Sequence, residues 1–443
     1  MKYYIETYGC QMNKAESAAL ENLFRAKGWS PGPADEADLV LINTCSVRIT
    51  AEDRAWGRIA HYAARKRVRP FTLAVTGCMA ERLRKELKSA QPAIDYVIGN
   101  FQKQAFEELA DAIGAGARPE NVPDVPETPV FSFASDHGTP GDFRSFVPIM
   151  HGCDNFCSYC IVPYVRGREV SRSPGDILAE IERLEDSGIR EITLLGQNVN
   201  SYRWRDGPGD PLDFPGLLRR ISARLSERGR GGIRWIRFLS SHPKDLSDEA
   251  LDAMAADERY CRHIHLCVQH GSDRILAAMN RRYTAEAYLA LVDRIRSRMP
   301  DVTLSTDILI GFPGETEEDV EATLELMRKV GYSYSFMYHF NPREGTPAAR
   351  MDNKVPDRVK KVRLARVIAL QKQLTRVRME ERLGSTVEVL VESVSRKRKT
   401  ELLGRTAGDM MVVFPGNPEN VGSFARVLLE SIQGNTFRAK EVP

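Results

Sequence analysis

The segment CDNFCSYC places Cys153, Cys157 and Cys160 on one short stretch of chain. Three thiolates at this spacing can bind three irons of a four-iron cubane and leave the fourth iron without a protein ligand. A small molecule can then chelate that open iron directly. Structural zinc is the alternative, but zinc needs a fourth nearby ligand, for which His151 is the only near candidate. The spacing therefore favours an iron–sulfur cluster.

Three further cysteines are far apart in the sequence, but each ends an apolar, strand-like run. The runs are YIETYGC, LVLINTC and LAVTGC, which end at Cys10, Cys45 and Cys78. In an open parallel sheet, ligands gather beyond the carboxyl ends of the strands, so three strands would bring three thiols to one edge. The pattern favours a second cluster with an open iron, with three buried structural cysteines as the alternative.

The apolar patterning predicts the secondary structure around these cysteines. Within residues 1–116, four short apolar runs alternate with helix-like segments, which predicts a parallel sheet covered by helices. Residues 117–143 are rich in Pro, Gly and acidic residues and are expected to form a linker.

The rest of the chain predicts two further domains. Residues 144–380 contain six strand candidates separated by helical patterns, which indicates an incomplete (βα)6 barrel, since a closed one needs eight units. This domain ends in a long basic helical stretch at 354–382. Residues 381–443 change to short alternating strands, which are typical of a small antiparallel β-barrel. The fold class is therefore α/β with an all-β C-terminal module.

Composition limits the environment and the partners. The sequence has eight cysteines, and neither a signal peptide nor an apolar run long enough to cross a membrane is visible, so a reducing cytoplasmic location is expected. The net charge is only +3, but basic residues gather locally: ten Lys/Arg against four acidic residues from Met351 to Gly384, and seven against two from Arg48 to Pro70. Such surfaces suit a phosphate backbone. Two solvated helix faces are the alternative.

The three-cysteine spacing at the head of a βα barrel resembles the radical S-adenosylmethionine (SAM) enzymes. The resemblance implies that SAM chelates the open iron and is cleaved by one electron to methionine and a 5′-deoxyadenosyl radical. Tyr159 matches the aromatic residue that contacts the adenine of SAM in that family. Polar residues at the ends of later strands are expected to contact cofactor or substrate, or to cap helices: Gln197, Ser240, Ser241 and Gln269.

Segments along essentially the whole chain resemble one branch of that family, the methylthiotransferases. They include ETYGCQMN (6–13), NTCSVR (43–48), VTGCMAE (75–81), LLGQNVNSY (194–202), FLSSHP (238–243) and GFPGETEED (311–319). The resemblance implies two [4Fe-4S] clusters, the second on Cys10, Cys45 and Cys78. The YGCQMN form is similar to that of the members that act on isopentenylated adenosine in tRNA. The C-terminal module resembles the TRAM domain, an RNA-binding barrel.

The resemblance also implies the reaction: methylthiolation of carbon 2 of N6-isopentenyladenosine at position 37 of tRNA. One SAM would methylate a cluster-bound sulfur and a second would supply the radical, so no side chain is expected to act as a catalytic nucleophile. The implied partners are the tRNA anticodon stem-loop, a sulfur donor, and an electron donor such as flavodoxin or ferredoxin. Two alternatives remain: a methylthiotransferase acting on a ribosomal protein or on threonylcarbamoyl-adenosine, and a zinc-containing RNA-binding protein without catalysis.

A basic loop in the C-terminal module is suited to RNA phosphates, with a solubilising loop as the alternative. It consists of Arg396, Lys397, Arg398 and Lys399. Arg166 and Arg168 follow the cysteine loop and have no assigned role.

One segment, HLCVQHGS, departs from the family pattern, because Cys267 and His270 stand where proline and serine are expected. Strand alternation puts four polar side chains on one face of this segment: His263, His265, Cys267 and Gln269. A packed polar layer is the expectation, with a metal site as the alternative. Cys261, nearby, has no assigned role.

Overall fold

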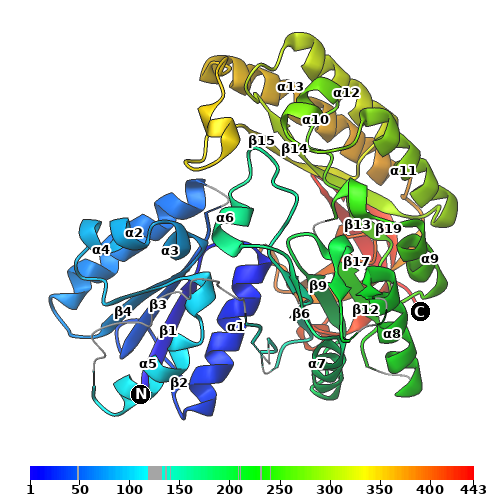
Figure 1. The fold of residues 1–443 in the computed structure, drawn as a ribbon. Coiled ribbons are helices and arrows are strands. Elements are labelled where there is room, and N and C mark those ends of the chain that lie inside the picture. The colour runs from blue at the N-terminus through cyan, green and yellow to red at the C-terminus, as the bar shows by residue number, and fades with distance from the viewer. Residues whose placement is uncertain are drawn as a thin grey trace.

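The computed structural model describes residues 1–46, 49–117, 132–134, 137–139, 141–207, 209, 211–229, 232–239 and 241–443. The chain forms an N-terminal α/β domain, an open barrel of six parallel strands and a closed five-stranded barrel (Figure 1). The predicted fold class is thereby confirmed. Most of the predicted linker, 117–143, lies outside the described residues. No helix in the described ranges is both long and apolar enough to span a bilayer.

The N-terminal domain is a parallel sheet with helices on both faces. Its strands lie in the order β2-β1-β3-β4-β5. The strands are β1 (Lys2–Thr7), β2 (Ser30–Pro31), β3 (Leu39–Thr44), β4 (Thr72–Gly77) and β5 (Tyr96–Ile98). The helices are α1 (Gln11–Ala26), α2 (Ile49–Lys66), α3 (Cys78–Arg82), α4 (Arg84–Ala90) and α5 (Ala105–Gly114), with a 3-10 turn at Asn100–Gln102.

Alternation along β3 explains this three-layer arrangement. Leu39 and Leu41 pack in the core beneath α1 and α5, whereas Val40 and Ile42 pack in the core beneath α2, α3 and α4. Every residue of β3 is buried. Central parallel strands that are covered on both faces need such continuous apolar runs. These runs are the reason that the sequence predicted a parallel sheet.

The open barrel consists of two three-stranded parallel sheets, β12-β9-β6 and β13-β14-β15. Parallel bridges from Ile236 to Tyr260 and from Ser241 to Leu266 join the two sheets. The six strands are β6 (Arg144–Pro148), β9 (Glu191–Leu195), β12 (Trp235–Phe238), β13 (His263–His265), β14 (Thr303–Ile310) and β15 (Tyr334–His339). Short pairs accompany them: β7 (Met150–His151) with β8 (Val170–Ser171), and β10 (Arg203–Trp204) with β11 (Leu212–Asp213).

Helices cover the outside of this barrel, and the sequence signals mark their ends. The helix α7 begins after the cap Ser173, whose hydroxyl accepts from the amide of Asp176, and α12 begins with a capping box between Thr316 and Asp319. Gly331 ends α12 in a left-handed conformation. The helices are α6 (Val162–Arg166), α7 (Pro174–Asp186), α8 (Phe214–Glu227), α9 (Asp248–Ala256), α10 (Asp273–Ala278), α11 (Ala285–Arg298), α12 (Glu317–Val330) and α13 (Asp357–Glu380). Single 3-10 turns lie at Val199–Ser201, Pro243–Asp245 and Pro347–Arg350.

The C-terminal barrel closes in the order β16-β17-β18-β20-β19. Its strands are β16 (Thr386–Val394), β17 (Glu401–Thr406), β18 (Met411–Pro415), β19 (Phe424–Gln433) and β20 (Thr436–Glu441), with a 3-10 turn at Pro418–Asn420. The pairing is antiparallel except between β18 and β20.

The turn between β17 and β18 docks against the amino ends of the open barrel's strands. Arg237 donates to the carbonyl oxygens of Thr406 (2.8 Å) and Ala407 (3.0 Å), and the Thr303 hydroxyl donates to the Gly408 carbonyl (2.8 Å). These hydrogen bonds attach the backbone of the turn to β12 and β14. The C-terminal barrel therefore covers the end of the open barrel that lies opposite the cysteine loop.

Candidate active site

A cavity of about 610 Å³ lies between the three domains. Its walls include all six predicted cluster ligands: Cys10, Cys45, Cys78, Cys153, Cys157 and Cys160. None of these cysteines is in a disulfide. Arg405 of β17 and Asp409 of the docked turn reach the same cavity from the C-terminal barrel. Cysteines from two domains therefore share one chamber, whose volume is in the range that holds a bound small molecule.

The loop trio, Cys153, Cys157 and Cys160, follows β7 and is shaped by local backbone geometry. Gly152 has a φ of +81°, and a Cβ there would come within 1.9 Å of the Arg168 carbonyl oxygen, so only glycine fits. Phe156 also has a positive φ of 47°. The Asn280 side chain supports this turn by donating to the carbonyls of Asn155 (3.1 Å) and Phe156 (3.0 Å). The loop is thus held mainly through its own backbone.

Among the loop thiols Cys157 is buried, whereas Cys153 and Cys160 are half-buried, and this burial has a chemical consequence. It raises the pKa of Cys153 to about 11 and the pKa of Cys160 to about 12. Arg281 is also buried, and its Nη1 donates to Cys157 Sγ at 3.4 Å. A thiol of raised pKa keeps its proton near neutral pH, so a metal that binds here must displace protons. Thiolates are the ligands that iron–sulfur clusters use.

The strand-end trio, Cys10, Cys45 and Cys78, is assembled by the sheet. Cys10 is the cap of α1, Cys45 follows β3, and Cys78 is the first residue of α3 after β4. At Gly77 the φ is +92°, and a Cβ would come within 2.2 Å of the Thr44 carbonyl oxygen. Glycine therefore allows the ends of β3 and β4 to approach closely enough to deliver both thiols.

Buried amide side chains fix the strand-end trio. Cys10 Sγ donates to Asn13 Oδ1 at 3.3 Å, and Asn13 Nδ2 donates to Asn43 Oδ1 (2.9 Å) and the Thr44 carbonyl (3.1 Å). Asn43 Nδ2 in turn donates to the Asn13 carbonyl (2.9 Å) and the Ser17 hydroxyl (3.0 Å). Asn13 and Asn43 are both fully buried. Contacts between α1 and β3, distant in sequence, therefore hold this trio.

A buried ion pair joins α6, which follows the loop trio, to α1, which begins after Cys10 of the strand-end trio. Arg166, at the end of α6, donates to Glu16 of α1 at 2.9 Å, and Lys103 lies 2.5 Å from the same carboxylate. Burial alone would raise the pKa of Glu16, but Arg166 and Lys103 outweigh it and hold that pKa well below its usual range. Arg166 Nη1 also lies 3.3 Å from Nδ1 of His151, next to the cysteine loop. Figure 1 shows α6 between the N-terminal sheet and the open barrel.

The predicted SAM contacts mostly reach the cavity. Tyr159, Gln197, Ser241 and Gln269 all line it, whereas Ser240 lies outside the described residues. Gln197 Oε1 accepts from the Gly152 amide at 2.6 Å, so this side chain braces the cysteine loop. Ser241 Oγ is buried and has no hydrogen-bond partner within the described part of the chain. An orphaned buried hydroxyl facing the cavity fits a site that receives a polar ligand.

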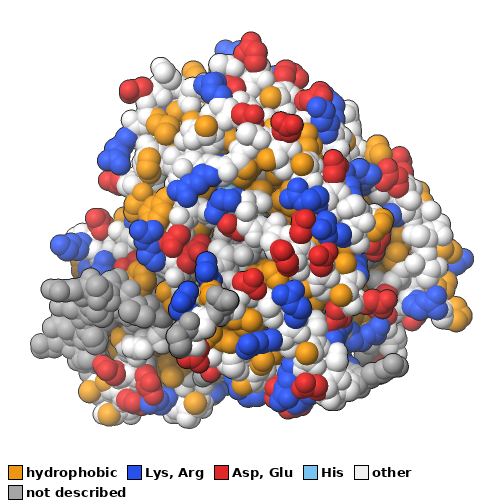
Figure 2. Space-filling model, turned by 45° about the vertical axis from the view of Figure 1, so that its right-hand side comes forward, with side chains coloured by type: hydrophobic (Ala, Val, Ile, Leu, Met, Phe, Trp, Pro, Cys, Tyr) orange, Lys and Arg blue, Asp and Glu red, His pale blue; other side chains and the backbone are white. Residues whose placement is uncertain are grey.

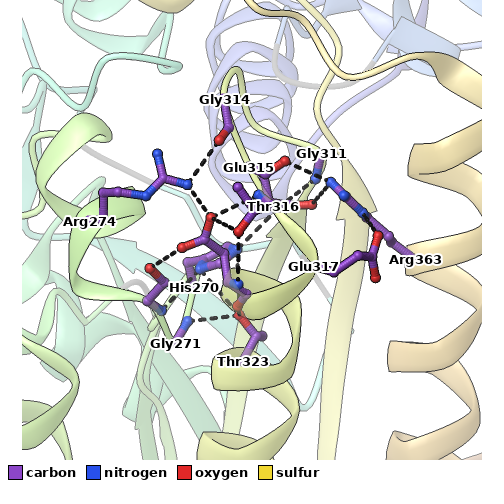
Figure 3. A network of polar contacts seen from close by, with 12 residues as sticks. His270, Gly271, Arg274, Gly311, Gly314, Glu315, Thr316, Glu317, Thr323 and Arg363 are labelled. Atoms are coloured by element: carbon purple, nitrogen blue, oxygen red, sulfur yellow. Dashed lines mark hydrogen bonds and ion pairs between the residues drawn. The ribbon is translucent and has the colours of Figure 1, made fainter.

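His270 belongs to a different environment from Cys267. It lies in a buried network that joins the segment after β13 to α12 and α13 (Figure 3). His270 Nε2 is 3.1 Å from Glu315 Oε2, and Glu315 also accepts from the Gly311 amide (2.7 Å) and from Arg363 (3.1 Å). Cys267 lines the cavity, but His270 is not among the described residues that do. The network therefore accounts for His270 structurally.

The predicted RNA-binding loop lies away from the chamber. Arg396, Lys397, Arg398 and Lys399 connect β16 to β17, are exposed, and are not among the described residues that line the cavity. Arg398 pairs with Glu401 at 3.2 Å. On the face shown in Figure 2, Lys and Arg side chains are interspersed with Asp and Glu. This arrangement agrees with the small net charge of +3.

Several residues that line the cavity could not be identified from the sequence alone. Arg281, Arg405 and Asp409 line the cavity from a loop and from a separate domain, and their local sequence carries no signal for this. Asp307 had a usable signal, since it is the single charged residue within the apolar strand β14.

Three family models match this chain. Residues 2–99 match Uncharacterized protein family UPF0004, residues 147–327 match the Radical SAM superfamily, and residues 380–442 match the TRAM domain. These ranges correspond to the N-terminal sheet, the open barrel and the closed barrel.

Curated relatives match over the full length. A tRNA-2-methylthio-N(6)-dimethylallyladenosine synthase from Treponema denticola is 50% identical over 450 residues, which cover 99% of this chain and 99% of that protein. The enzyme of the same name from Carboxydothermus hydrogenoformans is 42% identical, covering 99% and 98% of the two chains.

A solved structure shares the fold at low sequence identity. It is the radical S-adenosylmethionine methyltransferase TsrM from Kitasatospora setae, with a TM-score of 0.62 and 16% identity over 79% of this chain and 77% of that one. With full-length relatives at this identity, the chain belongs to the radical SAM methylthiotransferase family.

Proposed function

We propose that this enzyme attaches a methylthio group to carbon 2 of N6-dimethylallyladenosine in tRNA. The names of its full-length relatives support the substrate, and the C-terminal TRAM domain supports an RNA partner. The observation that carries the proposal is the single cavity lined by both cysteine trios. An aromatic C–H bond is not activated by acid–base side chains, so a reaction at carbon 2 requires a cofactor.

The donor sets fit two [4Fe-4S] clusters, each with one iron left open. In this proposal Cys153, Cys157 and Cys160 hold one cluster, and Cys10, Cys45 and Cys78 hold the other. When bound, the clusters and SAM supply the one-electron and methyl-transfer chemistry. The protein's own contribution is to bring the two trios to the walls of one cavity.

Polar residues around the loop trio are proposed to receive SAM. Gln197 braces Gly152 beside the loop, and Ser241 offers a buried hydroxyl that lacks a partner in the described residues. Tyr159 and Gln269 line the cavity near them and are proposed to contact the same ligand. For Ser240, which lies outside the described residues, contact with SAM stays a prediction. No side chain is assigned as a nucleophile.

The RNA partner is proposed to be the anticodon stem-loop with its adenosine turned out of the stack into the cavity. Arg396, Lys397, Arg398 and Lys399 lie away from the cavity and are exposed and basic, so they are proposed to bind phosphates of the same RNA farther from that adenosine. An electron donor of the flavodoxin or ferredoxin class and a separate sulfur donor complete the reaction. Because the proposed substrate is a tRNA, we expect the enzyme to be located in the cytoplasm.

The test is reconstitution under anaerobic conditions with SAM, a reductant and an isopentenylated anticodon stem-loop, followed by mass spectrometry of the nucleosides. We expect a 2-methylthio product, and none from the matched stem-loop that lacks the isopentenyl group. The substrate assignment is wrong if the enzyme thiolates threonylcarbamoyl-adenosine RNA or a ribosomal protein but leaves isopentenylated RNA unchanged.

A further inference from the structure

A group of three side chains outside both trios has the composition of a metal site. His265 ends β13, Cys267 lies two residues further on, and Asp307 belongs to the neighbouring strand β14. All three line the cavity. Within the described residues, one nitrogen, one sulfur and one oxygen from these side chains lie within 4.8 Å of one another. The sequence alone placed His265 and Cys267 on one face of a strand, and the fold brings the Asp307 carboxylate next to them.

The two separations that involve Asp307 match those around tetrahedral zinc. For bonds of about 2.3 Å to sulfur and about 2.0 Å to oxygen, tetrahedral geometry separates the two donor atoms by about 3.5 Å. Cys267 Sγ lies 3.5 Å from Asp307 Oδ2. An imidazole nitrogen and a carboxylate oxygen would be separated by about 3.4 Å, and His265 Nε2 lies 3.5 Å from that same Asp307 oxygen.

The surrounding contacts orient the imidazole as a metal ligand would require. The Nδ1 atom of His265 is 2.8 Å from the hydroxyl of Ser305, which is fully buried, so Nε2 is the nitrogen left facing Cys267 and Asp307. Metal-binding histidines typically use their second nitrogen in this way. The Cys267 carbonyl accepts from Arg281 at 2.5 Å, which fixes the backbone on the other side.

The charges of the donor set also suit a divalent cation. A thiolate and a carboxylate would together balance the charge of a divalent ion. Three protein ligands with an open fourth position are typical of zinc sites that bind water or a substrate atom.

We propose that His265, Cys267 and Asp307 bind a Zn²⁺ ion whose fourth position opens into the cavity. The site shares no ligand with either cysteine trio and does not depend on the proposed activity.

The experiment uses the holoprotein with both clusters loaded anaerobically, so that the six trio cysteines are occupied. After addition of one equivalent of Zn²⁺ and gel filtration, metal analysis should find about one zinc per chain with the iron content unchanged. X-ray absorption at the zinc edge should then give one sulfur ligand at about 2.3 Å and three nitrogen or oxygen ligands at about 2.0 Å.

Matched variants separate this site from other thiols. Cys267→Ala and Asp307→Asn should each weaken zinc binding by at least about 100-fold while the iron content stays the same, which also reports that the variant is folded. Cys261→Ala is the control, because Cys261 is buried beside Trp235 and Leu390, away from the cavity lining. It should bind zinc normally.

Two results would overturn the proposal. The first is a holoprotein that binds zinc no better than Cys267→Ala does, which would mean that the thiol only donates a hydrogen bond to Asp307. The second is a zinc spectrum with three sulfur ligands, which would mean that zinc had displaced iron from one of the trios.

Discussion

The two cysteine trios reach the same cavity by different physical means. The loop trio lies within eight consecutive residues, and its geometry depends on a glycine at positive φ and on backbone contacts. The strand-end trio spans 69 residues, from Cys10 to Cys78, and depends on strand pairing and on the buried amides of Asn13 and Asn43. One site is encoded locally and the other by tertiary structure. Damage to the N-terminal sheet should therefore affect one trio and spare the other.

Loss of a ligand from each trio should separate two activities, and this is the largest expected effect. Cys153→Ala should abolish both SAM cleavage and thiolation, because the open iron that receives SAM is lost. Cys78→Ala should abolish thiolation but leave SAM cleavage detectable. The measurements are 5′-deoxyadenosine and modified nucleoside from the same reaction. A Cys78→Ala enzyme that thiolates RNA at a normal rate would disprove the role of the strand-end trio.

The sequence alone predicts the two cysteine trios, because their cysteines stand at recognisable positions: on one short loop or at the ends of strands. Both trios could be predicted because CDNFCSYC is contiguous and because each strand-end cysteine follows an apolar run. The pairing of Arg166 with Glu16 could not, since 150 positions separate the two and neither segment marks its partner. The same holds for the turn from Thr406 to Asp409, whose docking depends on backbone carbonyls that any sequence provides.

Breaking the ion pair between the trios should have the next largest effect. Arg166→Met leaves the Glu16 carboxylate buried with only Lys103 beside it, which should cost about 3 kcal/mol in the free energy of unfolding. Denaturant unfolding measures this cost. Arg168→Met is the matched control, because its side chain is 72% exposed and its pair with Asp154 is on the surface. It should change stability by less than about 1 kcal/mol. Equal effects would mean that the buried pair does not hold the domains together.

Substitution of the supporting amides compares the trios directly. Asn43→Ala removes three buried hydrogen bonds and should cost about 1–3 kcal/mol, with iron lost from the strand-end trio alone. Asn155→Ala removes a long contact of 3.5 Å to Cys153 Sγ and should cost less than about 1 kcal/mol. Iron content and SAM cleavage distinguish the two. If Asn155→Ala lost more iron than Asn43→Ala, the loop would not be held by its backbone.

The pH dependence of stability tests whether the shared chamber is closed to bulk water. Burial, followed by the nearby charge of Arg281, lowers the pKa of His242 to about 2, whereas an unfolded histidine titrates near ~6.5. Between these values the unfolded chain binds one more proton than the folded one. The free energy of unfolding should therefore fall as pH drops below ~6.5, by up to ~1.4 kcal/mol per pH unit from this group.

His242→Asn should remove that contribution, and denaturant titrations between pH 7 and pH 5 would measure it. The exposed His61 supplies the control, as His61→Asn. An unchanged slope in His242→Asn would mean that water reaches this wall of the cavity.

The most direct test of a shared two-cluster chamber is the iron content of the anaerobically reconstituted protein. We expect about eight irons per chain in the wild type, and about four after Cys10, Cys45 and Cys78 are all changed to Ala. The remaining cluster should still cleave SAM. A wild-type protein with only about four irons, unchanged by the triple substitution, would contradict the assignment of the strand-end trio.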